Sequence, residues 1–355
     1  MLEALLDTCG DGAVLAMAGA LVGLVFGAAA QHSRFCLRAA TVELAERRVG
    51  PRLAIWLIAF STGVLSVQGA IALGWLDVSD ARPLAATGSL SGAIIGGVMF
   101  GVGMILARGC ASRLLVLSAG GNLRALVAGL VLTLVAQASL RGVLSPAREA
   151  LAALWTVPGG ASRDLLGMVG LSSAAAAGIA ALVLVGALAL GHGWRLPLSR
   201  ALAAMLVGLA VGLGWLATYA IAQLSFGVVP ISSVTFTGPS TDTLMALVNE
   251  RRLPLGFGIG LVPGVFVGAG AMALVTREWR LERFGPDTPT ERYLIGAALM
   301  GFGSMLAGGC AVGAGMSGGA IFALTAWVAV GAMWLGAMAT HLVLRGRTAT
   351  GAAPA

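Results

Sequence analysis

The sequence contains no lysine, and charged residues of any kind occupy only 10% of its 355 positions. Soluble globular domains are roughly 25% charged and about 45–50% apolar, whereas this chain is 58% hydrophobic with a mean hydropathy of +0.94. So few polar residues cannot cover the surface of a water-soluble fold. Several apolar runs also reach the roughly 18–20 residues that cross a bilayer. The sequence therefore predicts an all-α polytopic membrane protein.

Because lysine is absent, the formal net charge of +7 comes from arginine alone. In a soluble protein this excess would suggest nucleic acid as a partner. Here the arginines stand at the ends of hydrophobic runs, where membrane topology and lipid headgroups account for them. We therefore expect membrane lipid, and no nucleic acid, as a partner. The acidic residues Glu3, Asp7 and Asp11 before the first apolar run are not typical of a cleavable signal peptide.

Cysteine and histidine are also scarce. The four cysteines are Cys9, Cys36, Cys110 and Cys310, none of which belongs to a CxxC pair, and the three histidines are widely scattered. This spacing predicts neither a disulfide framework nor a clustered metal site, so we expect no cofactor. No segment resembles a nucleotide-binding motif, which argues against primary active transport. We also expect the chain not to be an enzyme.

The most informative feature that is present is a long internal repeat. The pattern Ile95-Gly96-x4-Gly101-x-Gly103-x2-Leu106-Ala107-x-Gly109-Cys110-Ala111 recurs 200 residues later without insertion, and nine of the seventeen aligned residues are identical. The second copy begins at Ile295 and ends in Gly309-Cys310-Ala311. The chain is thus predicted to consist of two related halves, each with one thiol at the same point.

Nine hydrophobic spans follow from the hydropathy pattern, at about 13–31, 52–76, 90–108, 122–140, 169–191, 198–222, 254–276, 291–308 and 320–343. Four further segments are too short, too polar or too rich in glycine to cross a bilayer alone, and they lie at about 33–47, 110–119, 226–249 and 310–319. Irregular backbone at membrane depth must pack in protein or line a wet cavity. We expect short re-entrant helices there, although a plain extramembrane loop explains 226–249 equally well.

The distribution of arginine predicts the orientation. With the N-terminus outside and the C-terminus in the cytoplasm, 16 of the 22 arginines fall on the cytoplasmic side, as the positive-inside rule favours. Residues 13–140 and 198–343 then form two halves of four spans each, and 141–197 hold a linker and the connecting fifth span. The two copies of the repeat run in opposite directions, which predicts inverted repeats with a substrate path between them. The similar pairs Gly19-x3-Gly23 and Gly208-x3-Gly212 are more simply explained by close helix packing.

Cys110 and Cys310 each end a long span and open a short segment. A thiol at the start of a helix lies beside unpaired backbone N–H groups, an arrangement that binds anions and activates thiols. An isolated cysteine in a membrane helix is usually a small hydrophobic residue, but the repeated glycine-framed position favours function for these two. Cys36 opens the first short segment in the same way, and Ser225-Phe226-Gly227 stands at the comparable point of the second half. Arg34 and Arg38 beside Cys36 could attract an anion, although positive-inside flanking explains them equally well. For Cys9 we expect no functional role.

Three separated motifs carry a family resemblance. Arg34-Phe35-Cys36, Arg108-Gly109-Cys110-Ala111-Ser112-Arg113 with Gly121-Asn122-Leu123-Arg124, and Gly308-Gly309-Cys310-Ala311-Val312-Gly313 resemble the YeeE/YedE sulfur-transport family, over about residues 15–343. Phe236-Thr237-Gly238-Pro239 is similar to that family's polar segment, whereas the stretch around 141–170 looks specific to this chain.

The resemblance implies an hourglass-shaped inner-membrane protein that takes up thiosulfate or a related sulfur or selenium species. It assigns substrate contact to Cys36, Cys110 and Cys310, whose thiols would relay the anion, and it implies a cytoplasmic TusA-like sulfur-carrier partner. Neutral thiols donate only weak hydrogen bonds, and a series of weak sites permits passage without a deep trap. We expect the spans to lack interior charge, because arginine at the waist would hold the anion too tightly.

Two other functions stay open. A membrane thiol redox protein would form a persulfide or mixed disulfide at Cys110 or Cys310, and a structural or regulatory subunit would use its cysteines only for packing. Whether uptake is passive or ion-coupled does not follow from the sequence, in which Asp242 is the only acidic residue near an expected core segment.

Overall fold

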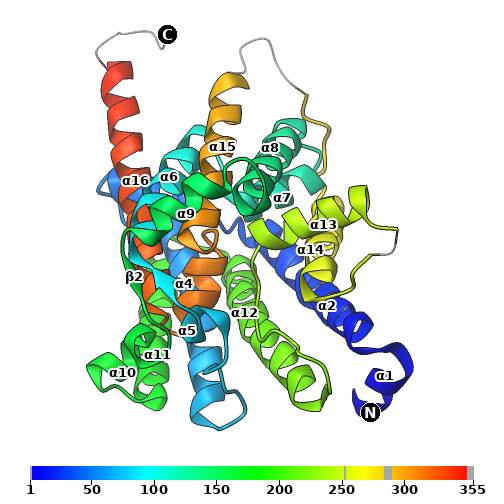
Figure 1. Ribbon diagram of the computed structural model, residues 1–355. Helices are drawn as coiled ribbons and strands as arrows, with labels where there is room; N and C mark the ends of the chain where they lie inside the picture. The colour runs from blue at the N-terminus through cyan, green and yellow to red at the C-terminus, as the bar shows by residue number, and fades with distance from the viewer. Residues whose placement is uncertain (1, 252, 284–289, 350–355) are drawn as a thin grey trace.

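The computed structural model describes residues 2–251, 253–283 and 290–349 and shows an almost entirely helical molecule (Figure 1). The only strands in the described ranges are β1 (Gly88–Ser89) and β2 (Thr156–Val157), which form a two-residue antiparallel ladder. The prediction of an all-α protein with several membrane-spanning helices is confirmed.

Every predicted span is a helix in the structure. These helices are α2 (Asp11–Ser33), α4 (Pro51–Ala72), α6 (Leu90–Leu106), α8 (Leu123–Arg141), α11 (Ser173–Gly193), α12 (Leu198–Leu224), α14 (Phe257–Val275), α15 (Thr290–Ala307) and α16 (Leu324–Ala349). In the described part of the chain, eight helical stretches are long and apolar enough to cross a membrane, one fewer than predicted. The difference is α15, whose first turn carries the charged residues Glu291 and Arg292.

Each of the four shorter segments also contains a helix. These are α3 (Leu37–Ala45), α7 (Ala111–Ala119), α13 (Thr237–Asn249) and the π-helix η2 (Gly313–Gly318). The first two directly follow α2 and α6 and extend the apolar stretches to 11–45 and 90–119. A further helix, α1 (Leu2–Cys9), precedes α2. The alternation of long and short helices therefore follows the hydropathy pattern.

The stretch 141–170 forms a series of short elements that tie two long helices together. It contains α9 (Ser145–Ala153), β2, the 3-10 turn η1 (Ala161–Arg163) and α10 (Leu165–Val169), and it packs near α5 (Arg82–Ala85). Arg163 is only 5% exposed and donates hydrogen bonds to the Ala86 carbonyl and the Thr325 hydroxyl. The connector thereby joins the segment before α6 to the start of α16.

Glycines let α6 and α15 cross at backbone contact. A Cβ built at Gly96 would lie 2.5 Å from the Gly303 carbonyl oxygen, and one at Gly303 would lie 2.6 Å from the Gly96 carbonyl oxygen. Gly103 and Gly296 meet each other in the same way. Residue 96 therefore faces residue 303 while 103 faces 296, so the two helices run antiparallel. Cys110 and Cys310, which follow their ends, lie at opposite ends of the pair.

The other helix crossings repeat this arrangement. Gly19 and Gly23 of α2 contact the backbone of α14, and Gly208 of α12 contacts the backbone of α4 at Ala59 and Gly63. The interpretation of these glycine pairs as sites of close helix packing is confirmed. Because dispersion at short range takes the place of the hydrophobic effect between membrane helices, these crossings stabilise the centre of the fold.

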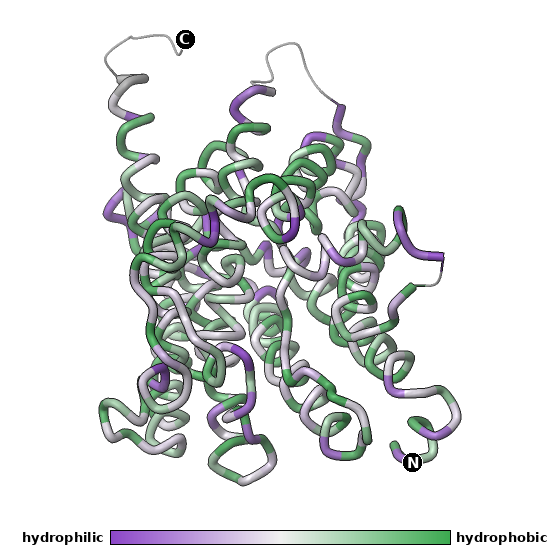
Figure 2. The backbone as a smooth tube through the Cα atoms, in the orientation of Figure 1, coloured by the Kyte–Doolittle hydropathy of each residue, from purple (hydrophilic) through white to green (hydrophobic). Residues whose placement is uncertain are grey.

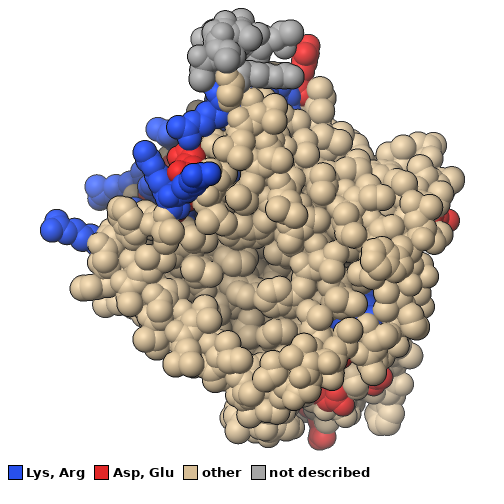
Figure 3. All heavy atoms as spheres, turned by 90° about the vertical axis from the view of Figure 1, so that its left-hand side faces the viewer, with Lys and Arg blue, Asp and Glu red and all other residues tan. Residues whose placement is uncertain are grey.

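Polarity is distributed along one axis of the molecule. Hydrophilic stretches lie mainly toward its two ends, with apolar helix between them (Figure 2). On the face drawn in Figure 3, arginines gather in the upper part of the view with a few acidic residues among and above them, and further acidic residues lie toward the bottom. Exposed arginines at the end that carries the C-terminus include Arg47, Arg48 and Arg345. The fold thus has one strongly basic end.

The α6–α15 crossing leads to a prediction about stability. Gly96→Ala would place a methyl group against the Gly303 carbonyl and the Ala307 amide nitrogen, which are backbone atoms that cannot rotate away. Overpacking of this kind costs about 1–3 kcal/mol, so the midpoint of thermal unfolding in detergent should fall. Gly331→Ala in α16 is the control, because its Cβ would have no heavy atom within 4 Å. Equal midpoints for the two variants would contradict the close crossing.

Candidate functional site

The three cysteines predicted as the site share one backbone geometry. Each follows by two residues a residue in the left-handed region at the end of a long helix, namely Arg34 (φ 57°), Arg108 (φ 57°) and Gly308 (φ 79°). Such a residue ends a helix and redirects the chain. Cys36 and Cys110 are then the extended N-cap residues of α3 and α7, and Cys310 lies just before η2. The same reversal thus places a thiol at the start of a short helix three times.

The structure brings Cys36 and Cys110 together. Their side chains lie close enough to interact with each other, and the backbone of Ala39 interacts with Cys36 and that of Arg113 with Cys110. The Cys110 Sγ atom is 3.3 Å from the Ser112 hydroxyl oxygen. Cys110 is buried and Cys36 half-buried, and all four cysteines are free thiols. These two residues, 74 positions apart in sequence, therefore form a single thiol pair.

Cys310 stands apart from this pair, at the opposite end of the α6–α15 crossing. Its Sγ atom accepts a hydrogen bond from the Gly313 amide at 3.4 Å, and the residue is 1% exposed. A Cβ at Gly313 would collide with the Thr235 hydroxyl, and Ser317 of η2 donates to the Val234 carbonyl. Cys310 is therefore buried, and the nearby residues Gly313, Thr235 and Ser317 carry no charge. Cys9 is exposed and lies in neither environment.

The expected counterpart of Cys36 in the second half was misplaced. Ser225 bonds to Asp11, and Phe226 is fully exposed, so this segment lies at the surface. The chain then runs without helix to Phe236, which caps α13 and packs against Phe26 with ring centroids 5.2 Å apart. Thr237, the first residue of α13, is 1% exposed and its hydroxyl has no hydrogen-bond partner. The short helix of the second half therefore starts at Thr237, because α12 continues to Leu224. Thr237, and not Ser225, stands at the position that corresponds to the start of α3 beside Cys36.

Two arginines beside the thiol pair were not predicted as part of the site. Arg113 of α7 interacts electrostatically with Cys36 and Cys110, and Arg38 of α3 interacts with Cys36. The Nη1 atom of Arg113 and the Nε atom of Arg38 are buried without a hydrogen-bond partner. The expectation that the spans lack interior charge concerns the long helices, whereas these two arginines lie on the short helices α3 and α7. Each arginine lies within one helical turn after its cysteine. From the sequence alone, attraction of an anion and membrane topology explain Arg38 equally well, and Arg113 counts only toward topology.

Other arginines at this end of the molecule have partners. Arg34 pairs with Glu278 at 2.9 Å, and Gln31 donates to the same carboxylate at 3.1 Å. The Arg34 hydrogen bond lowers the pKa of Glu278, which follows α14, so the carboxylate stays ionised near neutral pH. This pair links α2 to the segment after α14, although exposed ion pairs contribute little stability.

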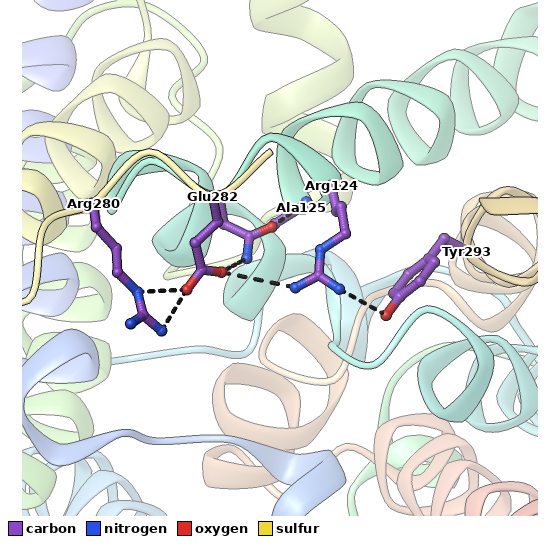
Figure 4. Close-up of polar contacts among 6 residues, drawn as sticks. Arg124, Ala125, Arg280, Glu282 and Tyr293 are labelled. Carbon is purple, nitrogen blue, oxygen red and sulfur yellow. Dashed lines mark hydrogen bonds and ion pairs between the residues drawn. The ribbon is translucent and has the colours of Figure 1, made fainter. Parts of the chain in front are cut away.

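Figure 4 shows a second polar cluster, in which Glu282 accepts hydrogen bonds from Asn122 and Arg280 and lies 3.8 Å from Arg124. Arg124 also donates to the Tyr293 hydroxyl at 3.4 Å. The guanidinium groups of Arg108 and Arg124 lie over the Tyr293 ring, 5.9 and 5.7 Å from its centroid. These contacts satisfy much of the positive charge around the α7–α8 turn. Across the described residues, no group of three or more His, Cys, Asp or Glu side chains is placed to hold a metal ion.

Comparison with known proteins agrees with this architecture. The sulphur transport family matches residues 32–339, which include all three site cysteines. A protein named thiosulfate transporter TsuA from Spirochaeta thermophila is 30% identical over 330 residues, covering 88% of this chain and 93% of its own. Its namesake from Escherichia coli is 34% identical over 133 residues, covering 38% of this chain and 36% of its own. The chain therefore belongs to the sulphur transport family, a family of transporters and not of enzymes.

Proposed function

We propose that this protein takes up thiosulfate, or a closely related small sulfur-containing anion, across the cell inner membrane. The observation that carries the proposal is the threefold occurrence of one motif, a thiol at the start of a short helix, within an apolar helical fold. Membership of the sulphur transport family and the names of the two relatives support the same substrate. Cys36, Cys110 and Cys310 are the substrate-binding residues in this proposal.

The two halves, 13–140 and 198–343, are inverted repeats in this proposal, joined by the linker and fifth span at 141–197. Contacts at equivalent positions of the two halves support it. Gly96 of the first half contacts Gly303 of the second, and the equivalent Gly296 of the second half contacts Gly103 of the first. In the same way, Gly101 contacts the backbone of Met333, and Gly301 contacts that of Leu132. A twofold rotation axis perpendicular to the antiparallel α6 and α15 relates such pairs of contacts. Transporters built this way place the substrate path at the interface between the repeats.

The N-terminus lies outside and the C-terminus in the cytoplasm under this proposal. The basic end of the molecule in Figure 3 is then the cytoplasmic end, in agreement with the positive-inside rule. Because α15 runs outward in this orientation and α6 inward, an incoming anion reaches Cys310 first. It reaches the Cys110–Cys36 pair second, and the cytoplasm after that.

The thiols suit an anion that has one soft and one hard end. The terminal sulfur of thiosulfate is polarisable, and a neutral thiol gives it a weak hydrogen bond that breaks easily. Backbone N–H groups at the starts of the short helices add favourable interaction with the negative charge. A sequence of such sites replaces part of the anion's hydration without holding it in a deep minimum. Transport then needs no covalent change at sulfur.

This mechanism predicts a specific effect of cysteine substitution. Cys110→Ala and Cys310→Ala should each reduce the uptake of radiolabelled thiosulfate by at least about ten-fold. Removing one site leaves a gap in the series that replaces the anion's hydration, and a barrier raised by about 1.4 kcal/mol slows passage ten-fold. Uptake should be measured in cells that lack other sulfur importers, with the amount of inserted protein determined in parallel. Cys9→Ala is the control, because Cys9 is exposed and outside the site. Wild-type rates for both Cys110→Ser and Cys310→Ser would show that sulfur is not what these positions supply.

The contact between Cys36 and Cys110 favours one alternative, a membrane thiol redox protein. In that mechanism a thiolate attacks the terminal sulfur of thiosulfate, the S–S bond breaks, sulfite leaves, and the cysteine becomes a persulfide. Intact-mass measurement after exposure of the purified protein to thiosulfate distinguishes the two mechanisms. The transport mechanism predicts an unchanged mass, whereas the redox mechanism predicts the added mass of one sulfur atom.

A cytoplasmic TusA-like sulfur-carrier protein is the proposed consumer of the imported anion. Uptake down a gradient stops unless the anion is consumed, and exposed arginines such as Arg47, Arg48 and Arg345 offer an electrostatic surface for a partner. Purified protein in liposomes should admit thiosulfate down its gradient without any partner. Enclosing the carrier should raise the amount accumulated and leave the initial rate unchanged. Liposomes that admit thiosulfate only when the carrier is present would contradict an autonomous pathway.

A further inference from the structure

We propose that Arg38 and Arg113 form a binding site for a small tetrahedral dianion beside the Cys36–Cys110 thiol pair. Within the part of the chain that the structure describes, neither guanidinium belongs to an ion pair. Both carry a buried nitrogen without a hydrogen-bond partner. Both residues are partly buried. A guanidinium nitrogen that is buried without a partner or counterion is costly, so an anion that bonds to these nitrogens is favoured.

The surroundings of the two arginines contain little that could neutralise them. Arg113 interacts with Cys36, Cys110 and two further arginines, and Arg38 interacts with Cys36, Arg108 and Tyr293. No carboxylate is among these neighbours. The carboxylates nearby are engaged elsewhere: Glu278 by Arg34, Glu282 by Arg280 and Asn122, Glu43 by the backbone N–H groups of Arg52 and Leu53, and Glu46 by His341. None of these contacts neutralises Arg38 or Arg113.

The shape of the site matches an oxyanion whose two ends differ. Guanidinium groups present planar pairs of N–H donors that fit oxyanion geometry. The two thiols lie next to them and offer weak donors and polarisable sulfur. A sulfonate group would contact the arginines while a terminal sulfur contacts the thiols. The inference rests on the proposed transport function, in which this site is the last station before the cytoplasm.

Alignment of the repeats shows that the site exists in one half only. Shifting by 200 residues places Gly308 opposite Arg108 and Gly313 opposite Arg113. A side chain at Gly313 is excluded because Thr235 occupies its space, and the Gly313 amide donates to Cys310 instead. The Cys310 station is therefore neutral and the Cys110 station cationic. A dianion passing from the first to the second binds more tightly as it moves.

Radiolabelled sulfate is the probe for this site, because it carries the same charge as thiosulfate but no terminal sulfur for the thiols. Equilibrium binding should be measured on the purified full-length protein in a neutral detergent. Arg113→Gln and Arg38→Gln are expected to weaken sulfate binding at least ten-fold. Arg113→Lys keeps the charge but loses the paired donors, so its affinity should fall between those of wild type and Arg113→Gln. Arg48→Gln is the matched control, since Arg48 is exposed and its loss removes the same charge.

Wild-type affinity in both glutamine variants would overturn the proposal, as would an equal loss in Arg48→Gln. A second measurement needs no variant of an arginine. Sulfate should slow the alkylation of the half-buried Cys36 relative to chloride at equal ionic strength, and an unchanged rate would also overturn the proposal. A soluble short-chain phosphatidylglycerol that displaces sulfate at lower concentration than thiosulfate does would assign the site to a lipid headgroup instead.

The binding assay separates this proposal from that of transport. Arginine-dependent sulfate binding together with liposomes that do not admit thiosulfate would leave the anion site standing and refute the conduit. Liposomes that admit thiosulfate together with arginine variants that bind sulfate normally would leave transport standing and refute the site.

Discussion

The backbone contact between α6 and α15 is the constraint on which the arrangement of the site depends. Gly96, Gly103 and their repeat equivalents allow the two helices to touch along their carbonyl groups, where a Cβ on either side would overlap the other backbone. The crossing is antiparallel, so the cysteine that follows each helix emerges at a different end. Larger residues at these four positions would push α6 and α15 apart. The short helices α7 and η2, which follow them, would then also move apart. The close approach of the two helices is thus set by glycine, and the lengths of the helices place Cys110 and Cys310 at opposite ends of the pair.

The second constraint is the chain reversal before each cysteine. A left-handed residue two positions earlier ends the long helix and places the thiol where the short helix begins. Gly308 adopts this conformation without steric cost, whereas Arg34 and Arg108 adopt it against one. Both arginines have partners that hold them, Glu278 for Arg34 and the Tyr293 ring for Arg108. Packing and electrostatics therefore support a backbone that local preference alone would not select.

Much of this fold could be predicted because its periodic features are local. Apolar runs identified all nine long helices, and the glycine-cysteine repeat located two of the three thiol stations. Two features of the candidate site could not be predicted from local sequence patterns, namely the position of Thr237 and the role of Arg38 and Arg113. Polar residues such as Ser225 and Thr237 look alike in sequence, and only the length of α12 decides which one returns to the core. Arg38 and Arg113 look like topology signals, because membrane orientation and anion binding both select arginine at helix ends. Burial and missing partners distinguish the two roles, and those depend on tertiary structure.

Arg38 and Arg113 make the two halves of the proposed inverted repeat differ in charge, and this difference favours movement of an anion in one direction. Moving a dianion inward against a negative-inside potential costs about 2.3 kcal/mol per charge for each 100 mV, so a pathway with equal stations would become less favourable along its length. In the proposed orientation, the fixed positive charge of Arg38 and Arg113 would lie toward the cytoplasm and would offset part of that cost where it is largest. The same charge slows release of the anion. Arg108 and Arg34 are already held by Tyr293 and Glu278, so only the two guanidinium groups that lack partners would bind it. In the proposed mechanism, a neutral Cys310 site and a cationic Cys36–Cys110 site would combine loose capture outside with retention inside, and consumption of the anion in the cytoplasm would maintain its gradient.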